Sequence, residues 1–162
     1  MQTLVILKLL ALLTIANGAP VVARRLLGHR LSFPLDGHVR FFDDRPLLGA
    51  SKTVRGLVFS VVATSIASLL LGMWLSTGFL VRVGAMAGDL LSSFTKRRLA
   101  LQPSSRATGL DQIPESLVPA LMCWHELSLT AADVVAVVGL FFFGEIVLSR
   151  LLFRMHIRDR PY

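Results

Sequence analysis

The stretch GDLLSSFTKRR, residues 88–98, ends an apolar run with a carboxylate, hydroxyls and three cations. If it is helical, Asp89, Ser93 and Lys96 share one face, because side chains three or four residues apart lie above one another on a helix. Charged groups of this density do not stay in hydrocarbon without partners. The stretch is therefore predicted to be the end of a membrane helix, where lipid meets cytosol.

The composition is typical of an integral membrane protein. Apolar residues make up 54% of the 162 residues, and the mean hydropathy is +0.66. A soluble domain holds about 45–50% apolar residues and does not collect them into runs of about 20. The length predicts a single membrane-embedded domain over residues 1–162, with an all-α fold.

Five apolar runs are predicted to be transmembrane helices. They cover residues 3–22, 57–75, 78–91, 116–127 and 131–153. The fourth run is too short to cross about 30 Å of hydrocarbon by itself. It starts deeper in the membrane, extends into the preceding loop or is partly re-entrant, and the sequence leaves these three arrangements open.

The basic residues predict the orientation. Seven lie in residues 23–55, four in residues 92–115 and four in residues 150–160, whereas the opposite side has Arg82 and a snorkelling Lys8. Because cytosolic loops carry the excess of Lys and Arg, we expect an outer N-terminus, an inner C-terminus and two functional cytosolic loops. The predicted location is the cytoplasmic membrane, with the functional site facing the cytosol.

The sequence gives less support to two other interpretations, nucleic-acid binding by the basic residues and a cleaved signal peptide at the N-terminus. A net charge of +7 favours nucleic acid only where basic and aromatic residues alternate, and here the cations stand beside apolar spans instead. No nucleic-acid partner is expected, and the cations are expected to meet membrane lipids or nucleotide phosphates. A cleaved signal peptide ending near residues 16–18 would lack a basic n-region, and Lys8 would interrupt its apolar part.

Several single residues have structural interpretations. Cys123 is the only cysteine and is predicted to pack in the core, and four scattered histidines lack the spacing of zinc ligands. Thr130 and Asp133 fit a capping box at the start of the fifth span. Glu115 is predicted to cap the fourth span.

The first cytosolic loop carries the segment GASKTVRG, residues 49–56, at the entrance of the second span. Lys52 is a point-charge donor for phosphate, and Thr53 with the following amides would add hydrogen bonds at a helix N-terminus. The alternative is a basic flank that only fixes topology. The polar loop also carries Phe41 and Phe42, so we expect it to fold back onto the membrane surface.

The second cytosolic loop is bounded by two carboxylates, Asp89 and Asp111. If they meet, they would bridge Mg²⁺, which takes its other ligands from water and substrate phosphate. The alternative is that Asp89 pairs with Arg97 or Arg98 in a purely structural role. Within the spans, Asn17 is expected to contact either a neighbouring helix or a ligand, and Glu145 is a functional candidate that has an equally good structural explanation.

These residues together resemble one known family. The pattern is Pro34-x-Asp36, Asp43, Gly49-x-x-Lys52-Thr53-x-Arg55-Gly56, Gly88-Asp89, Ser93-Phe94-x-Lys96-Arg97-Arg98 and Asp111-Gln112. It resembles CDP-archaeol synthase, a membrane cytidylyltransferase related to phosphatidate cytidylyltransferase. The similarity runs along nearly the whole chain, from Asn17 to the closing residues 160–162. The chain departs from the wider cytidylyltransferase signature at Pro103-Ser104, where that signature has Pro-Gly, and Asp111-Gln112 stands near its Asp-Arg.

The resemblance implies an enzyme that transfers CMP from CTP to a lipid phosphate, with Mg²⁺ as cofactor. The implied residues are Asp89, Lys52, Lys96 and Asp111 for catalysis; Asp89 and Asp111 for metal; Lys52, Thr53, Arg55, Ser93, Lys96, Arg97 and Arg98 for phosphates; and Asn17, Asp36, Asp43 and Gln112 for support. Two alternatives stay open, a CTP-dependent polyprenol or lipid kinase and a non-catalytic membrane scaffold. The sequence leaves the lipid and a homodimer undecided.

Overall fold

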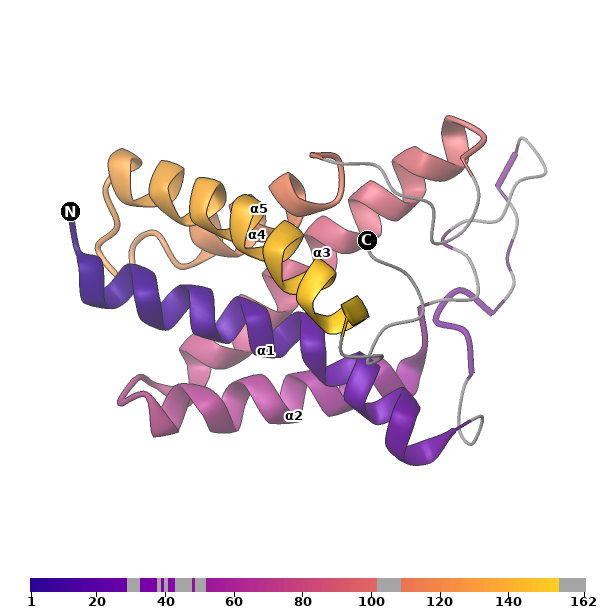
Figure 1. The fold of residues 1–162 in the computed structure, drawn as a ribbon, viewed down its shortest axis with the longest axis horizontal. Coiled ribbons are helices and arrows are strands. Elements are labelled where there is room, and N and C mark those ends of the chain that lie inside the picture. Colours follow the sequence, from indigo (N-terminus) through magenta and orange to yellow (C-terminus); the bar gives the residue numbers. More distant parts are fainter. Residues whose placement is uncertain are drawn as a thin grey trace.

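The computed structural model describes residues 1–28, 33–37, 39, 41–42, 48, 52–101 and 109–154. These residues form five helices, drawn in Figure 1: α1 (Thr3–Leu27), α2 (Val54–Leu70), α3 (Leu75–Arg98), α4 (Gln112–Met122) and α5 (Ala131–Arg154). Within the described ranges, the one extended pairing is an isolated antiparallel bridge between Pro34 and Thr53. The prediction of an all-α fold agrees with this arrangement.

The helix ends differ from the predicted spans for local reasons. The α2 helix begins at residue 54, not 57, because the Thr53 hydroxyl caps it by accepting the Gly56 N–H at 3.2 Å. It ends near Gly72, whose φ of 66° suits glycine and allows a tight turn. The α3 helix continues to Arg98, seven residues beyond its predicted span, since hydropathy does not register the helical propensity of its basic last turn.

The α4 helix corrects the prediction for the fourth span. It covers Gln112–Met122, so it begins four residues earlier and ends five residues earlier than predicted. Its first turn is polar and contains Pro114, which a helix tolerates there because the missing N–H would have no partner. Residues 123–128 form turns, in which the Leu127 N–H donates to the Cys123 carbonyl at 2.9 Å.

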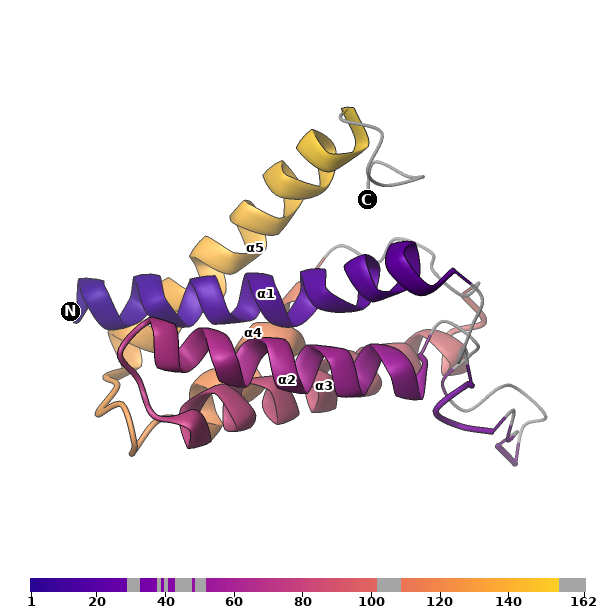
Figure 2. The same cartoon turned by 90° about the horizontal axis from the view of Figure 1, so that it is seen from below.

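The α1 helix packs against α2, α3 and α5, and α3 lies between α2 and α4. The core contains leucines 9, 12 and 13 of α1 with Val81 of α3 and Val137 of α5, all inaccessible to solvent. Cys123 is also buried, which confirms its predicted packing role. Figure 2 shows α5 leaving α1 at an angle along its C-terminal half, so the bundle opens between these two helices.

Two glycines allow α3 and α4 to approach closely. A Cβ at Gly84 would lie 2.6 Å from the Pro119 Cα, and a Cβ at Gly88 would lie 2.7 Å from the Glu115 nitrogen. Close backbone contact through small residues is typical of membrane helices. This contact places the first turn of α4 beside Gly88 and therefore next to Asp89.

The outer surfaces of the helices are strongly apolar. Val135, Phe143 and Val147 of α5 expose about two thirds or more of their surface. Among the described residues, α1 and residues 131–151 of α5 are long and apolar enough to cross a membrane, whereas α2 is apolar but has 17 residues. The number of spans and their orientation stay predictions.

The two ends of the bundle have different chemistry. At the end that holds the N-terminus (Figure 1), Thr130 and Asp133 exchange hydrogen bonds, which confirms the capping box. The same Asp133 carboxylate accepts the Gln2 N–H at 2.9 Å and fixes the start of α1 to α5. The opposite end holds the start of α2 and the end of α3, and therefore Lys52 and the basic turn of α3.

Candidate active site

The loop between α1 and α2 holds Lys52 against α3. The Leu35 N–H donates to the Lys52 carbonyl at 2.7 Å, and the Val54 N–H donates to the Phe33 carbonyl at 3.0 Å. This short bridge fixes the backbone of Lys52 just before α2. Its ammonium group forms an ion pair with the carboxylate of Asp89. The two polar segments found in the sequence thus meet at one point.

A second ion pair lies beside the first. Lys96 Nζ is 2.7 Å from Asp111 Oδ1, and the Ser92 hydroxyl donates to the same oxygen at 3.0 Å. Ser92 also lies 3.2 Å from the carbonyl oxygen of Asp89, so it links the two carboxylate residues. The sequence singled out Ser93, but Ser92 makes this link. Both serines lie three or four residues from Asp89 and Lys96, so spacing alone does not distinguish them.

Arg97 and Arg98 occupy different environments. Arg97 is buried, and burial lowers the pKa of its guanidinium while the nearby Asp111 carboxylate raises it. The Arg98 guanidinium lies 4.7 Å from the ring centre of Phe41 and 5.0 Å from that of Phe94. These cation–π contacts hold Phe41 of the loop between α1 and α2 on the end of α3. The expected folding of this loop onto the membrane surface stays a prediction.

Three residues predicted to bind phosphate or support the loops have structural partners. Arg55 Nη1 donates to the Gly28 carbonyl at 3.0 Å, which joins the end of α1 to α2. Gln112 Oε1 accepts the Gly109 N–H at 2.9 Å at the entrance of α4. Asp36 is buried and accepts the Leu48 N–H at 3.0 Å, so it orders the loop. Asp43 lies outside the described residues.

One acidic residue outside the predicted centre, Glu115, faces it. Glu115, in the first turn of α4, interacts electrostatically with Asp89 and Glu145 and with the cations Lys52 and Arg82. The sequence assigned Glu115 only to helix capping. Its position four residues after Asp111, on the same helix face, was the signal that would have placed it near the site.

Arg82 corrects the predicted charge distribution. The sequence placed it at the outer surface, but it is only 6% exposed and interacts electrostatically with Asp89 and Glu115. Its Nη1 also lies 3.4 Å from the Ala16 carbonyl, which accepts the Ser60 hydroxyl at 2.6 Å. This carbonyl is available because Pro20, four residues later in α1, has no N–H to donate to it. Hydropathy cannot reveal such an internal acceptor.

We expect Arg82→Met to destabilise the bundle by about 1.5–3 kcal/mol, because it removes the charged hydrogen bond to the Ala16 carbonyl and one of the two cations that face Glu115. Thermal unfolding in detergent would measure this loss. Arg24→Met on the exposed side of α1 is the matched control and should have little effect. Equal melting temperatures for the two variants would contradict the internal role of Arg82.

Metal binding is a second role that the carboxylates can have. The described residues contain no cluster of three or more His, Cys, Asp or Glu side chains arranged around one point. Mg²⁺ does not need such a cluster, because it keeps waters and commonly uses one or two carboxylates together with substrate phosphates. Asp89 and Asp111, linked through Ser92, provide hard oxygen donors of that kind. The residues therefore fit Mg²⁺ shared with a nucleotide.

A family model described as CarS-like, CDP-archaeol synthase, matches residues 3–162. The chain belongs to this family. A CDP-archaeol synthase of Sulfurisphaera tokodaii is 31% identical over 135 residues, which cover 80% of this chain and 81% of the relative. A CDP-archaeol synthase of Thermofilum pendens is 34% identical over 155 residues, covering 91% and 76%.

A solved structure gives an independent comparison. It is described as an intramembrane enzyme for archaeal membrane lipid biosynthesis, and it superposes with a TM-score of 0.70 at 26% identity. The match covers 85% of this chain and 90% of the solved chain. The resemblance found in the sequence is thus confirmed. This CDP-archaeol synthase family member is a membrane-embedded enzyme of lipid biosynthesis, of the CTP-dependent cytidylyltransferase class.

Proposed function

We propose that the protein transfers CMP from CTP to a membrane lipid phosphate and releases pyrophosphate. An oxygen of the lipid phosphate attacks the α-phosphorus of CTP, and the bond from this phosphorus to the bridging oxygen of the β-phosphate breaks. The products are a CDP-activated lipid and pyrophosphate. The observation that supports this reaction most strongly is the pair of lysine–carboxylate contacts, Lys52–Asp89 and Lys96–Asp111, beside one another at one end of an apolar bundle.

The proposed roles follow from the charge of the reactants. Two phosphate-bearing anions must approach each other, so positioning and charge neutralisation account for most of the rate enhancement. Lys52 and Lys96 would hold phosphate oxygens, and Arg97 would add a buried positive charge behind them. Asp89 and Asp111 orient the two lysines before substrate binds. When Mg²⁺ is bound by these carboxylates and the nucleotide, it would neutralise charge on the triphosphate.

The lipid substrate and the location are also part of the proposal. The relatives are named CDP-archaeol synthase, which favours an isoprenoid ether lipid over an acyl ester lipid for this chain. The excess of basic residues in residues 23–55 and 92–115 supports a site at the cytosolic face of the cytoplasmic membrane, where CTP is available.

The test is incubation of the purified protein in detergent with Mg²⁺, α-labelled CTP and a panel of lipid phosphates. The panel contains phosphatidic acid, unsaturated archaetidic acid and polyprenyl phosphate. We expect label in the organic phase with archaetidic acid, together with release of pyrophosphate. Release of CDP with phosphorylation of a lipid alcohol would indicate a kinase. Absence of both transfer and CTP binding would favour a scaffold.

A further inference from the structure

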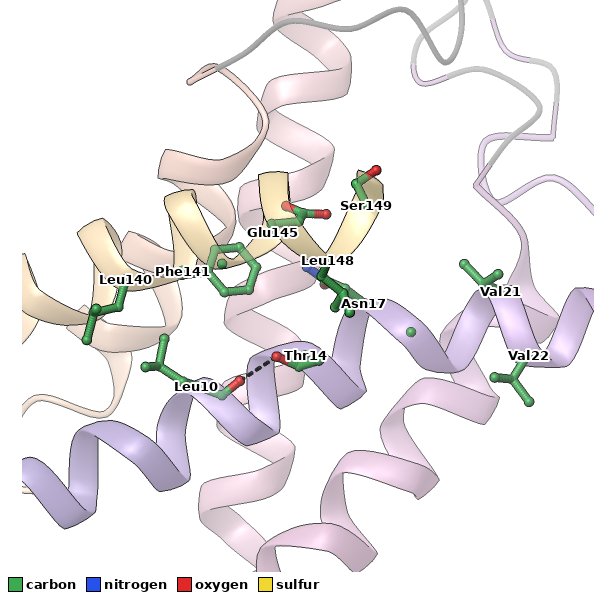
Figure 3. A pocket seen from close by; sticks show the side chains of 12 residues that line it. Leu10, Thr14, Asn17, Val21, Val22, Leu140, Phe141, Glu145, Leu148 and Ser149 are labelled. Atoms are coloured by element: carbon green, nitrogen blue, oxygen red, sulfur yellow. Dashed lines mark hydrogen bonds between the residues drawn. The ribbon is translucent and has the colours of Figure 1, made fainter. Parts of the chain in front are cut away.

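A groove of about 430 Å³ separates α1 from α5 (Figure 3). Its walls are mostly apolar and include Val21 of α1 and Leu140, Phe141 and Leu148 of α5. The groove lies where the C-terminal half of α5 leaves α1 (Figure 2), and all its lining residues come from these two helices. A ligand that fills it must be largely apolar.

One polar side chain in the groove lacks a partner. Both the nitrogen and the oxygen of the Asn17 amide are buried without a hydrogen bond among the described residues. Leaving a buried amide unpaired costs free energy, so native proteins pair such groups or use them for ligands. Thr14, one turn away, does have a partner, because its hydroxyl donates to the Leu10 carbonyl at 2.9 Å.

The α1 wall of the groove continues to a contact with the start of α2, directly after Lys52. Pro20 lies one helical turn beyond Asn17, and its Cβ would be 3.3 Å from a Cβ placed on Gly56. That same position is 3.1 Å from the hydroxyl of Thr53, the residue after Lys52. A helical turn rises about 5.4 Å, so Asn17 stands roughly one turn from the start of α2. A single amphipathic molecule would reach both places.

We infer that the groove seats a hydrocarbon chain of the lipid substrate, and that the Asn17 amide binds the uncharged oxygen joining this chain to the phosphate-bearing part. The inference rests on the proposed function. Because Asn17 lines the groove, a rotation of its side chain brings the amide to that oxygen. The lining also contains the carboxylate of Glu145, which repels a phosphate. The phosphate therefore lies beyond the groove, toward Lys52 and Lys96.

Filling the groove is the direct test. Gly144 lines it, and a Cβ added at this glycine would have no neighbouring atom within 4 Å, so Gly144→Leu enters the groove without striking the backbone. Gly139→Leu on the same helix also meets open space but lies outside the lining, which makes it the matched control. We expect Gly144→Leu to raise the KM for the lipid phosphate at least roughly 10-fold, with the Kd for CTP unchanged.

Asn17→Leu tests the polar contact, since it keeps the side-chain size and removes the amide. We expect a rise of roughly 3- to 10-fold in the KM for an intact lipid phosphate, the effect of one hydrogen bond. For glycerol 1-phosphate carrying no chain ether oxygens, wild type and variant should be equal. A loss of the same size with both substrates would overturn the assignment of Asn17.

Photocrosslinking supplies a readout besides activity. A lipid phosphate with a diazirine in its chain should label peptides of α1 and α5 in wild type, and labelling should fall in Gly144→Leu. If wild type transfers label from CTP and Gly144→Leu changes neither the KM nor the crosslinking, the groove is not the lipid site, while the proposed function stands. A change of oligomeric state in Gly144→Leu with unchanged lipid KM would identify a second copy of this chain as the occupant. No transfer and no CTP binding by wild type would reject the proposed function itself.

Discussion

Asp89→Asn is expected to lower kcat/KM by roughly 10³-fold or more while leaving the protein folded in detergent. The substitution keeps the shape of the side chain and an oxygen that accepts from Lys52, so the local packing survives. It removes the negative charge that would hold Mg²⁺ and orient the Lys52 ammonium. Initial rates of label transfer from CTP, with circular dichroism as the folding check, would measure the effect.

Glu126→Gln is the matched control for this loss of charge. Glu126 accepts a hydrogen bond from the hydroxyl of Thr77, which lies in the first turn of α3, 12 residues before Asp89. Its neutral variant should keep near wild-type turnover. If Asp89→Asn retained activity comparable to that of Glu126→Gln, the assignment of Asp89 to the catalytic centre would be wrong.

Gly88→Ala is expected to cost about 3 kcal/mol of stability and most of the activity. The added methyl would lie 2.7 Å from the Glu115 nitrogen and closer still to the Pro114 carbonyl, and backbone atoms cannot turn aside as a flexible side chain can. The α3 and α4 helices must then separate, which costs about 1–3 kcal/mol or more for overpacking. Because Asp89 and Glu115 adjoin the contact, their relative positions change too.

The control for this steric effect is Gly139→Ala in α5. A Cβ there has open space within 4 Å, and alanine has the higher helix propensity, so the melting temperature should stay equal or rise. Thermal unfolding of both variants in the same detergent would compare them. A Gly88→Ala protein as stable as Gly139→Ala would show that the helices do not meet as closely as described.

The sequence supplied the membrane class, the helical fold and the family, because each is carried by many residues at once. The apolar runs are longer than most helices of soluble proteins, so they can be recognised without knowledge of tertiary structure. The capping box of Thr130 and Asp133 can also be recognised, because it depends only on residues close together in the sequence. The position of α4 was harder to predict from the sequence. Its polar first turn, from Gln112 to Glu115, reads as loop in a hydropathy profile although it packs on Gly88.

The internal electrostatics of the site were not predictable from one sequence. The partners of Arg82 are seven or more residues away in the sequence, so in a single sequence Arg82 indicates only topology. No neighbouring residue shows that its side chain turns inward to Ala16 and the carboxylates. Ser92 and Ser93 are equivalent in composition, and only the rotation of α3 selects Ser92. Thr53 caps α2 and Arg55 donates to the Gly28 carbonyl, two structural contacts that the sequence did not predict; phosphate binding by these residues stays a prediction.

We expect the two lysine–carboxylate pairs to form one site for cytidylyl transfer to lipid. Parallel reactions with α-labelled and γ-labelled CTP, Mg²⁺ and unsaturated archaetidic acid test it most directly. We expect the α-label to enter the lipid and the γ-label to stay in the aqueous phase as pyrophosphate. Label from the γ-phosphate in the lipid, or no transfer of either label by protein that is folded and binds CTP, would contradict it.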